Sequence, residues 1–296
     1  MSEVTYQTTR TRPDWLKIKL KTSEKYLETQ RLIHGSKLHT VCEEARCPNI
    51  YECWGNQTAT IMILGDICTR SCGFCSVKTG KPAVTDLTEP KRTAEAVKAM
   101  QLRHVVITSV DRDDLKGDYG AAVWADTIRE VRKSAPQCTI EVLTPDFRNY
   151  QPALKKVFSA APDIFSHNVE CAERISRQVR PQSDWDRSKA VLQASVEWGL
   201  TTKTGMMVGL GESDREVLET MEEFAKLGVA IFNVGQYLQP TKNHLPVHRF
   251  VHPDTFSIYE TEGYKMGFKV VESGPLVRSS YHADEQARQL SNNTLN

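Results

Sequence analysis

Between residues 60 and 240, short apolar runs alternate with longer segments whose apolar positions recur every three or four residues. The short runs have the length of strands, and the longer segments have the period of amphipathic helices. Six strands are predicted, over Ile61–Leu64, His104–Thr108, Thr139–Leu143, Ile164–Asn168, Thr202–Val208 and Ile231–Leu238. Helices are predicted between them, over Thr93–Leu102, Ala121–Ser134, Pro152–Ala160, Ser183–Trp198 and Ser213–Leu227.

Local signals mark the ends of several of these helices. Ser213 and Glu216 have the spacing of a capping box, in which both side chains satisfy free backbone N–H groups at a helix start. The segment Ser183–Asp186 is a looser version of the same signal. Gly199 and Gly228 follow two of the helices, where a left-handed C-terminal cap is favoured.

The alternation of strands and helices predicts an α/β fold with a parallel sheet, since each helix returns the chain across the sheet. A doubly wound sheet and a partial (β/α)6 barrel of the TIM type both fit this pattern. The predicted core covers residues 59–240, between an N-terminal extension (1–58) and a C-terminal extension (241–296). The second extension is expected to hold a helix near Asp254–Met266 and a strand near Phe268–Glu272.

Composition narrows the classes of protein. The 296 residues are 40% hydrophobic and 25% charged with a net charge of +1, so neither nucleic acid nor a membrane surface is indicated as a partner. No apolar run approaches the roughly 18 residues of a membrane span. The start, Met1–Gln7, lacks an apolar secretory core, which favours a cytoplasmic location. In that compartment the eight cysteines are expected to be thiols or metal ligands rather than disulfides.

Six of these eight cysteines lie within 34 residues and form two triplets, Cys42, Cys47, Cys53 and Cys68, Cys72, Cys75. Each triplet lacks the fourth thiolate that closes a structural zinc site. A cubane iron–sulfur cluster held by three cysteines leaves one iron open to another ligand. The second triplet directly follows the first predicted strand, where barrel enzymes place catalytic loops. A three-ligand zinc site or an unmetallated group of cysteines is the alternative.

The second triplet, with its C-x3-C-x2-C spacing in a βα loop, resembles that of the radical S-adenosylmethionine (SAM) superfamily. The resemblance implies that Cys68, Cys72 and Cys75 hold a [4Fe–4S] cluster whose open iron is chelated by SAM. An electron from the cluster would then cleave SAM to methionine and a 5′-deoxyadenosyl radical. An unactivated methylene is not acidic, so its functionalisation requires a cofactor that supplies radical chemistry.

With the first triplet included, the chain resembles the lipoyl synthase family over nearly its whole length. The shared motifs are Gly65–Cys75, Thr108–Leu115, Glu141–Phe147, His167–Glu170, Met207–Glu212, Gly235–Thr241 and Gly274–His282. The resemblance implies a second, auxiliary [4Fe–4S] cluster on Cys42, Cys47 and Cys53. Its fourth ligand would be Ser280, with Ser279 as the less favoured neighbour. A serine oxygen suits a cluster iron less well than a thiolate, which leads to the hypothesis that this iron leaves as the cluster gives up sulfide.

The same resemblance implies the residues that contact SAM, which are Phe74, Asp111, Asp113, Asn168, Glu170, Arg180, Gln236 and Tyr237. Two alternatives remain open for these residues. The aspartates could instead cap the following helix, and Arg180 could pair with a surface carboxylate. Cys171 stands where the family usually has threonine. The hydrogen bond that a threonine would provide beside Glu170 is therefore in doubt. The isolated Cys138 and Cys171 are predicted to lie in the core.

The implied activity is the insertion of two sulfur atoms at carbons 6 and 8 of a protein-bound octanoyl chain, with the auxiliary cluster as sacrificial sulfur donor. The implied partners are octanoylated lipoyl carrier domains (dehydrogenase E2 subunits and the glycine cleavage H protein), an electron donor such as flavodoxin or ferredoxin, and a cluster-assembly carrier. Two other interpretations remain. One is a different sulfur-inserting or methylthiolating radical SAM enzyme, and the other is a non-catalytic iron–sulfur carrier or zinc-binding module.

Overall fold

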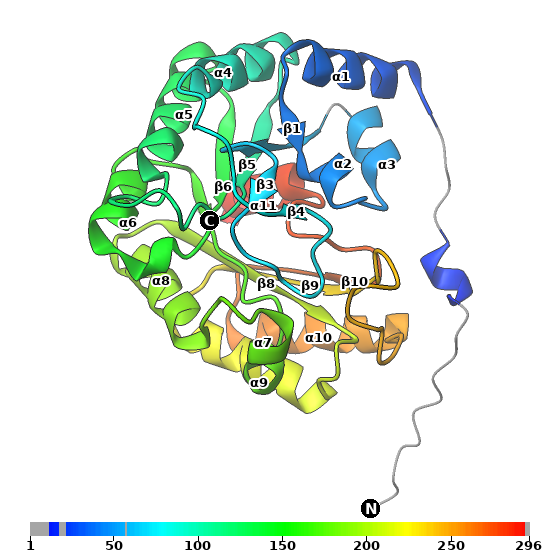
Figure 1. Ribbon diagram of the computed structural model, residues 1–296. Helices are drawn as coiled ribbons and strands as arrows, with labels where there is room; N and C mark the ends of the chain where they lie inside the picture. Colours follow the sequence, from blue (N-terminus) through cyan, green and yellow to red (C-terminus); the bar gives the residue numbers. More distant parts are fainter. Residues whose placement is uncertain (1–11, 18–21, 57, 294–296) are drawn as a thin grey trace, which may run out of the picture.

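A computed structural model describes residues 12–17, 22–56 and 58–293 (Figure 1). The segment Met1–Gln7, on which the predicted location depends, lies outside the described residues. All six predicted strands form, with bounds within two residues of the prediction: β2 (Thr60–Ile63), β5 (His104–Ser109), β6 (Thr139–Leu143), β7 (Ile164–Ser166), β8 (Thr201–Val208) and β9 (Ile231–Gln236).

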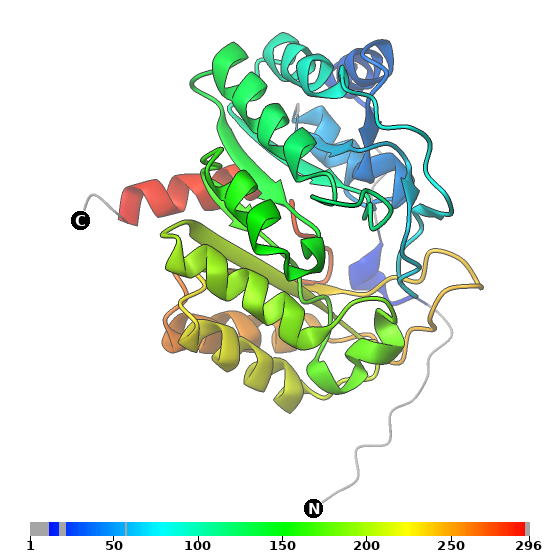
Figure 2. The same ribbon diagram turned by 60° about the vertical axis from the view of Figure 1, so that its left-hand side comes forward.

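These six strands are parallel and are neighbours in the order in which they occur in the chain. A doubly wound sheet reverses its strand order at a switch point, and this sheet has no such reversal among its described strands. The sequential order therefore decides between the two predicted architectures in favour of the partial barrel. Figures 1 and 2 show helices arranged around the outside of the curved sheet.

Each extension adds one strand to this sheet. The short β1 (His39–Thr40) pairs antiparallel with β2, and β10 (Val270–Gly274) pairs parallel with β9. These two strands form the edges of the eight-stranded sheet. The segment after β10 reaches across the gap between them, because the Asn49 side-chain amide donates to the Leu276 carbonyl at 2.7 Å. The barrel is thus completed by chain from both extensions.

The outer helices are α4 (Glu89–Ala99), α5 (Ala121–Ser134), α6 (Gln151–Phe158), α7 (Glu173–Val179), α8 (Trp185–Glu197), α9 (Asp214–Lys226) and α10 (Pro253–Met266). The capping box of α9 is confirmed, since the Ser213 and Glu216 side chains both accept bonds from the backbone. The cap of α8 is Asp184 rather than Ser183, and its carboxylate accepts from the Arg187 N–H. The short helix α7 was not predicted from the sequence.

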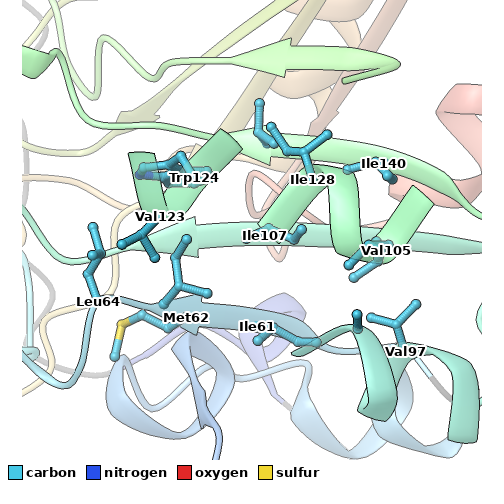
Figure 3. Packing of buried hydrophobic residues seen from close by; sticks show 14 of the residues in the cluster. Ile61, Met62, Leu64, Val97, Val105, Ile107, Val123, Trp124, Ile128 and Ile140 are labelled. Atoms are coloured by element: carbon cyan, nitrogen blue, oxygen red, sulfur yellow. The ribbon is translucent and has the colours of Figure 1, made fainter. Parts of the chain in front are cut away.

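Buried apolar side chains fill the space between the sheet and its helices (Figure 3). Ile61, Val105 and Ile107 on the strands pack with Trp124 and Ile128 of α5, and all five are fully buried. Cys138 and Cys171 are also buried, as predicted for core cysteines. This core fixes the strands whose ends carry the site.

The remaining elements belong to the two extensions and to loops between the barrel strands and helices. The N-terminal extension contains the 3-10 turn Asp14–Leu16 and the helices α1 (Glu24–Gly35), α2 (Val41–Glu44) and α3 (Ile50–Gly55). A small parallel pair, β3 (Ile67–Cys68) and β4 (Lys78–Thr79), brackets the second cysteine triplet, and a 3-10 turn covers Phe147–Asn149. The last helix, α11 (Ala283–Asn293), covers the starts of β7, β9 and β10 through Leu290. Among the described residues, none of the helices has the length and apolar character needed to cross a bilayer.

Candidate active site

A cavity of about 480 Å³ lies at the carboxyl ends of the barrel strands, and all six clustered cysteines line it. The two triplets, 15 residues apart in the chain at their nearest members, therefore face one common space. All eight cysteines are free thiols, which confirms that none is in a disulfide. Residues at the ends of β5, β6, β7 and β9 also line it, as expected for a barrel enzyme, together with parts of β8 and of both extensions.

The second triplet lies in the loop between β3 and β4. The Cys68 sulfur accepts hydrogen bonds from the backbone N–H groups of Arg70 and Asp111, at 3.4 and 3.3 Å. Burial raises the pKa of Cys68 to about 11, and it also raises the pKa values of Cys72 and Cys75. Reactive free cysteines have a lowered pKa, whereas a coordinated metal deprotonates a thiol outright. These thiols fit metal ligands and do not fit free nucleophiles.

The first triplet is held by two short helices of the N-terminal extension. Cys42 lies in α2 and Cys53 in α3, while Cys47 lies in the turn that joins them. Burial raises the pKa of Cys42 to about 12, although the contact with Thr60 opposes this shift. Burial also raises the pKa of Cys53. This triplet has the same chemical character as the second.

The two serines of the C-terminal motif point in different directions. The Ser280 hydroxyl accepts a hydrogen bond of 2.7 Å from Thr60, a residue that lies beside the Cys42 sulfur. The Ser279 hydroxyl accepts a bond of 2.6 Å from the Asn168 side-chain amide at the end of β7. This arrangement favours Ser280 over Ser279 as the fourth donor beside the first triplet.

A buried arginine inside the second triplet was missed in the sequence analysis. Arg70 is only 3% exposed, and its guanidinium bonds Asp113 at 2.8 Å and Asp146 at 2.7 Å. It also lies 3.2 Å from Asp111. These contacts fasten the cysteine loop to the ends of β5 and β6. The signal in the sequence was an arginine between Cys68 and Cys72, but nothing local identified its partners.

The two predicted aspartates have different positions. Asp111 lines the cavity, and burial raises its pKa to about 6. Asp113 is absent from the lining, since its carboxylate is bound by Arg70 and Arg148, and its contact with a cofactor stays a prediction. Neither aspartate caps α5, whose N-cap is Gly120 with φ of +87°. The helix-capping alternative is therefore wrong.

Asn168, Glu170 and Arg180 all line the cavity. Arg180 is buried and donates to the Asn168 carbonyl at 3.2 Å, so its alternative role in a surface ion pair is wrong. Glu170 has φ of +69° and is held by backbone bonds to Gly205 and Met207. A non-glycine residue in this region is held there by its surroundings and occurs preferentially at functional sites.

Of the two predicted residues at the end of β9, Tyr237 lines the cavity and Gln236 does not, as with the two aspartates. Tyr237 lines the cavity, and its hydroxyl donates to the Leu245 carbonyl at 2.7 Å. Gln236 is fully buried and does not line the cavity, because its amide donates to three backbone carbonyls and accepts from Val251. Its contact with SAM stays a prediction that this placement does not support. Phe74 lines the cavity, and its contact with SAM stays a prediction.

The loop after β9 contacts the cysteine loop directly, which the sequence did not indicate. The Leu245 N–H donates to the Gly73 carbonyl at 2.9 Å, and a His244 ring nitrogen lies 3.0 Å from the Cys75 carbonyl. The Gly73 and Cys75 backbone is therefore held from outside the loop. Tyr237 belongs to the same arrangement through its bond to Leu245.

Unpaired polar atoms in the lining indicate a bound polar group. The Asn168 and Asn233 side-chain oxygens and the Arg180 Nε are buried with no hydrogen-bond partner among the described residues. A buried polar atom without a partner costs about 1–3 kcal/mol, so such atoms are expected to meet a ligand. Together with two sets of three thiols, this donor set fits two iron–sulfur clusters and a polar cofactor such as SAM.

Comparison with known proteins agrees with this chemistry. Residues 62–224 match the model of the radical SAM superfamily. Proteins named lipoyl synthase from Rubrobacter xylanophilus and Shouchella clausii are 54% and 53% identical to this chain. The alignments cover 96% and 94% of this chain and 89% and 91% of those proteins. A lipoyl synthase from Bacteroides fragilis is 50% identical over 94% of this chain and 96% of its own length.

Solved structures support the fold alone. Streptococcus suis SuiB with its precursor peptide superposes with a TM-score of 0.58 at 10% identity, covering 76% of this chain and 50% of SuiB. Methylornithine synthase superposes with a TM-score of 0.51 at 12% identity, covering 86% of this chain and 79% of that enzyme.

Proposed function

Because this chain belongs to the lipoyl synthase family of the radical SAM superfamily, we propose that it inserts two sulfur atoms, at carbons 6 and 8, into a protein-bound octanoyl chain. The observation that carries the proposal is the single cavity that both cysteine triplets line. A carbon chain in this space would meet both sites without leaving the protein, and a reaction between held groups needs no bimolecular encounter.

The cofactors of the family are SAM and two [4Fe–4S] clusters, which supply the radical chemistry and the sulfur when bound. We assign Cys68, Cys72 and Cys75 to the cluster that meets SAM. Cys42, Cys47, Cys53 and Ser280 would hold the auxiliary cluster. In this assignment residues 59–240 carry the SAM site, and the extensions 1–58 and 241–296 together carry the auxiliary site.

The other lining residues would position the reactants. The unpaired atoms of Asn168 and Arg180 and the carboxylate of Glu170 suit the amino, carboxylate and ribose groups of SAM. Phe74 and Tyr237 would cover the cofactor, and Tyr237 keeps its hydroxyl bonded to Leu245. Apolar lining from Met62, Met206, Met207 and Leu143 suits an octanoyl chain.

The protein partners follow from the family. A lipoyl synthase acts on a lipoyl carrier protein, and we propose octanoylated E2 subunits of dehydrogenases and the glycine cleavage H protein as substrates. Flavodoxin or ferredoxin would supply electrons, and a cluster-assembly carrier would rebuild the auxiliary site, with all of these partners in the cytoplasm.

The test is anaerobic iron and sulfide analysis of the protein, followed by mass spectrometry of an octanoylated carrier peptide after addition of SAM and reductant. We expect two clusters per chain and a mass gain of two sulfurs less two hydrogens. A methylthiolated product would identify a different radical SAM enzyme. A protein that releases no 5′-deoxyadenosine on reduction would instead be a metal carrier.

A further inference from the structure

We propose that Arg12, Arg46 and Arg278 form a docking site for an acidic peptide segment next to the modified lysine of the carrier protein. The inference rests on the proposed function, because it concerns how that substrate is presented to the cavity. The three residues are called the arginine cluster below. All three line the cavity on the side of the first cysteine triplet.

The arginine cluster has no acidic partner in the part of the chain that the structure describes. The Arg278 guanidinium donates only to its neighbouring carbonyl, Val277, at 2.6 Å. Burial lowers the pKa of Arg278, and the nearby positive charge of Arg12 lowers it further, while Cys47 opposes both. Like charges that act on each other in this way are stabilised by an anion placed near both of them.

The acidic side chains of the surrounding helices are engaged elsewhere. Glu43 bonds His34 at 2.9 Å, and Glu44 lies 3.8 Å from His39. Glu52 accepts a bond of 3.2 Å from the Tyr281 hydroxyl. Among the described residues, none of these carboxylates forms an ion pair with the arginine cluster, so its positive charge is available to a ligand from outside the chain.

The fold holds Arg12 and Arg46, the two exposed members of the arginine cluster, at the mouth of the cavity. Leu16 is fully buried and the Trp15 ring packs against His252 with centroids 5.0 Å apart, which anchors the segment that carries Arg12. Arg46 lies in the tight turn between Cys42 and Cys47, where its φ is +51°. Arg12 and Arg46 both line the cavity, and both are exposed to solvent. They therefore lie where the cavity opens to solvent.

This position suits a peptide better than it suits an iron–sulfur cluster. An anionic cluster on the first triplet would lie nearest to Arg278, whose charge Cys47 already senses. Arg12 and Arg46 are exposed, and their solvation weakens any interaction with a buried charge. A substrate carried on a lysine side chain must leave its backbone outside the cavity. The residues beside that lysine therefore lie at the mouth, next to these two arginines.

The partner is identified by its charge. The chain carries a net charge of only +1, so attraction to a carrier would come from this local group rather than from the whole surface. Aspartate or glutamate beside the modified lysine would form exposed or half-buried ion pairs with the cluster. Exposed pairs contribute about 0.2–1 kcal/mol each, which corresponds to roughly 1.5-fold to fivefold in affinity per arginine.

The test measures binding without turnover. Two fluorescent peptides carry octanoyl-lysine, one flanked by aspartate and glutamate and one by asparagine and glutamine. Fluorescence anisotropy with the anaerobically reconstituted full-length protein gives Kd for each peptide at low and high salt. The variants are Arg12→Gln and Arg46→Gln. Arg31→Gln is the control, because Arg31 is an exposed arginine of α1 that does not line the cavity.

We expect the acidic peptide to bind more tightly than the neutral one, with a difference that shrinks as salt rises. Arg12→Gln and Arg46→Gln should each weaken the acidic peptide about twofold to fivefold and leave the neutral peptide unchanged. Arg31→Gln should change neither. Equal affinity for the two peptides, or equal weakening of both by the variants, would overturn the inference.

Two further measurements separate the inference from the proposed function. If the variants lose iron instead of affinity for the acidic peptide, the arginines serve the auxiliary cluster and the docking site is refuted. Mass spectrometry of both peptides at saturating concentration tests the reaction itself. Thiolation of both peptides with no difference in Kd would refute only the docking site. Charge-dependent binding without thiolation of either peptide would refute only the proposed function.

Discussion

The hydroxyl of Thr60, the first residue of β2, donates a hydrogen bond of 2.7 Å to the hydroxyl of Ser280, which lies 220 residues later in the chain. The same threonine lies beside the sulfur of Cys42. Thr60 therefore stands between the first cysteine triplet and the C-terminal motif. The contact brings an oxygen donor to a site that three sulfurs already surround.

Replacement of Ser280 by cysteine tests the chemical reason for an oxygen at this position. Thiolate is the softer ligand and binds iron more firmly, so Ser280→Cys should retain its auxiliary iron through turnover and form little thiolated product. Release of 5′-deoxyadenosine should continue. Iron counts before and after turnover, with mass spectrometry of the peptide, give the result. Ser279→Cys is the control, and full turnover by Ser280→Cys with a firmly held cluster would remove the argument.

Gly235 allows the C-terminal motif to pass close to β9. A Cβ atom at this position would lie 2.1 Å from the Val277 carbonyl oxygen, which is backbone and moves only with the whole segment. Gly235→Ala should therefore displace Ser280 and reduce auxiliary iron, while iron on the second triplet is kept. Gly35→Ala is the matched control, because a Cβ there has no neighbour within 4 Å. Equal iron contents in the two variants would contradict this prediction.

We expect Arg70 to hold the loop of the second triplet in position and to take no direct part in the reaction. Lysine keeps the charge but lacks the planar fork that bonds Asp113 and Asp146 at once, so Arg70→Lys should loosen the loop of the second triplet. We expect a loss of about 2–4 kcal/mol in unfolding free energy and faster loss of iron on chelator challenge. Arg148→Lys is the comparison, since Arg148 is 40% exposed and its ion pair should contribute about 0.2–1 kcal/mol. The interpretation fails if the two variants behave alike.

A buried ion pair joins β6 and β8. The Lys203 ammonium lies 2.9 Å from Glu141, and both side chains are almost completely buried. Lys203→Met should cost about 3–5 kcal/mol, because it leaves a buried carboxylate without its cation. The double variant Lys203→Met/Glu141→Leu should recover most of this loss. Thermal unfolding measures both, and a double variant as unstable as the single one would rule out the charge as the cause.

The stability of the protein should depend on pH through His167. Burial lowers the pKa of His167 to about 4, while its ring bonds the Thr144 carbonyl and the Ser188 hydroxyl. The unfolded chain, with a histidine pKa near 6.5, binds this proton more readily, so stability is full above pH 6.5 and falls as pH drops toward 4. The unfolding free energy of His167→Gln should therefore fall less steeply than that of the unmodified protein between pH 7 and pH 5.5. Parallel stability curves for the two proteins would contradict the assignment.

The sequence alone determined the features that depend on near neighbours in the chain. Helix α5 has the predicted bounds, Ala121–Ser134, and the capping box at Ser213 forms, because period and capping act over a few residues. The two cysteine triplets were also recognisable, since their spacing within one loop or one pair of helices limits what they can bind. These local patterns predicted a metal or cluster site, and the resemblance to the radical SAM superfamily implied its chemistry.

Only the tertiary structure decided which groups face the cavity. Asp111 and Tyr237 line it while their neighbours Asp113 and Gln236 turn to Arg70 and to backbone carbonyls. The pairing of Ser280 with Thr60 likewise needs β10 to dock on the far edge of the sheet. Residues that lie next to or near each other at a strand end cannot be told apart by local sequence patterns as cavity-facing or not. Their directions are set by partners distant in the chain, which no local pattern in one sequence specifies.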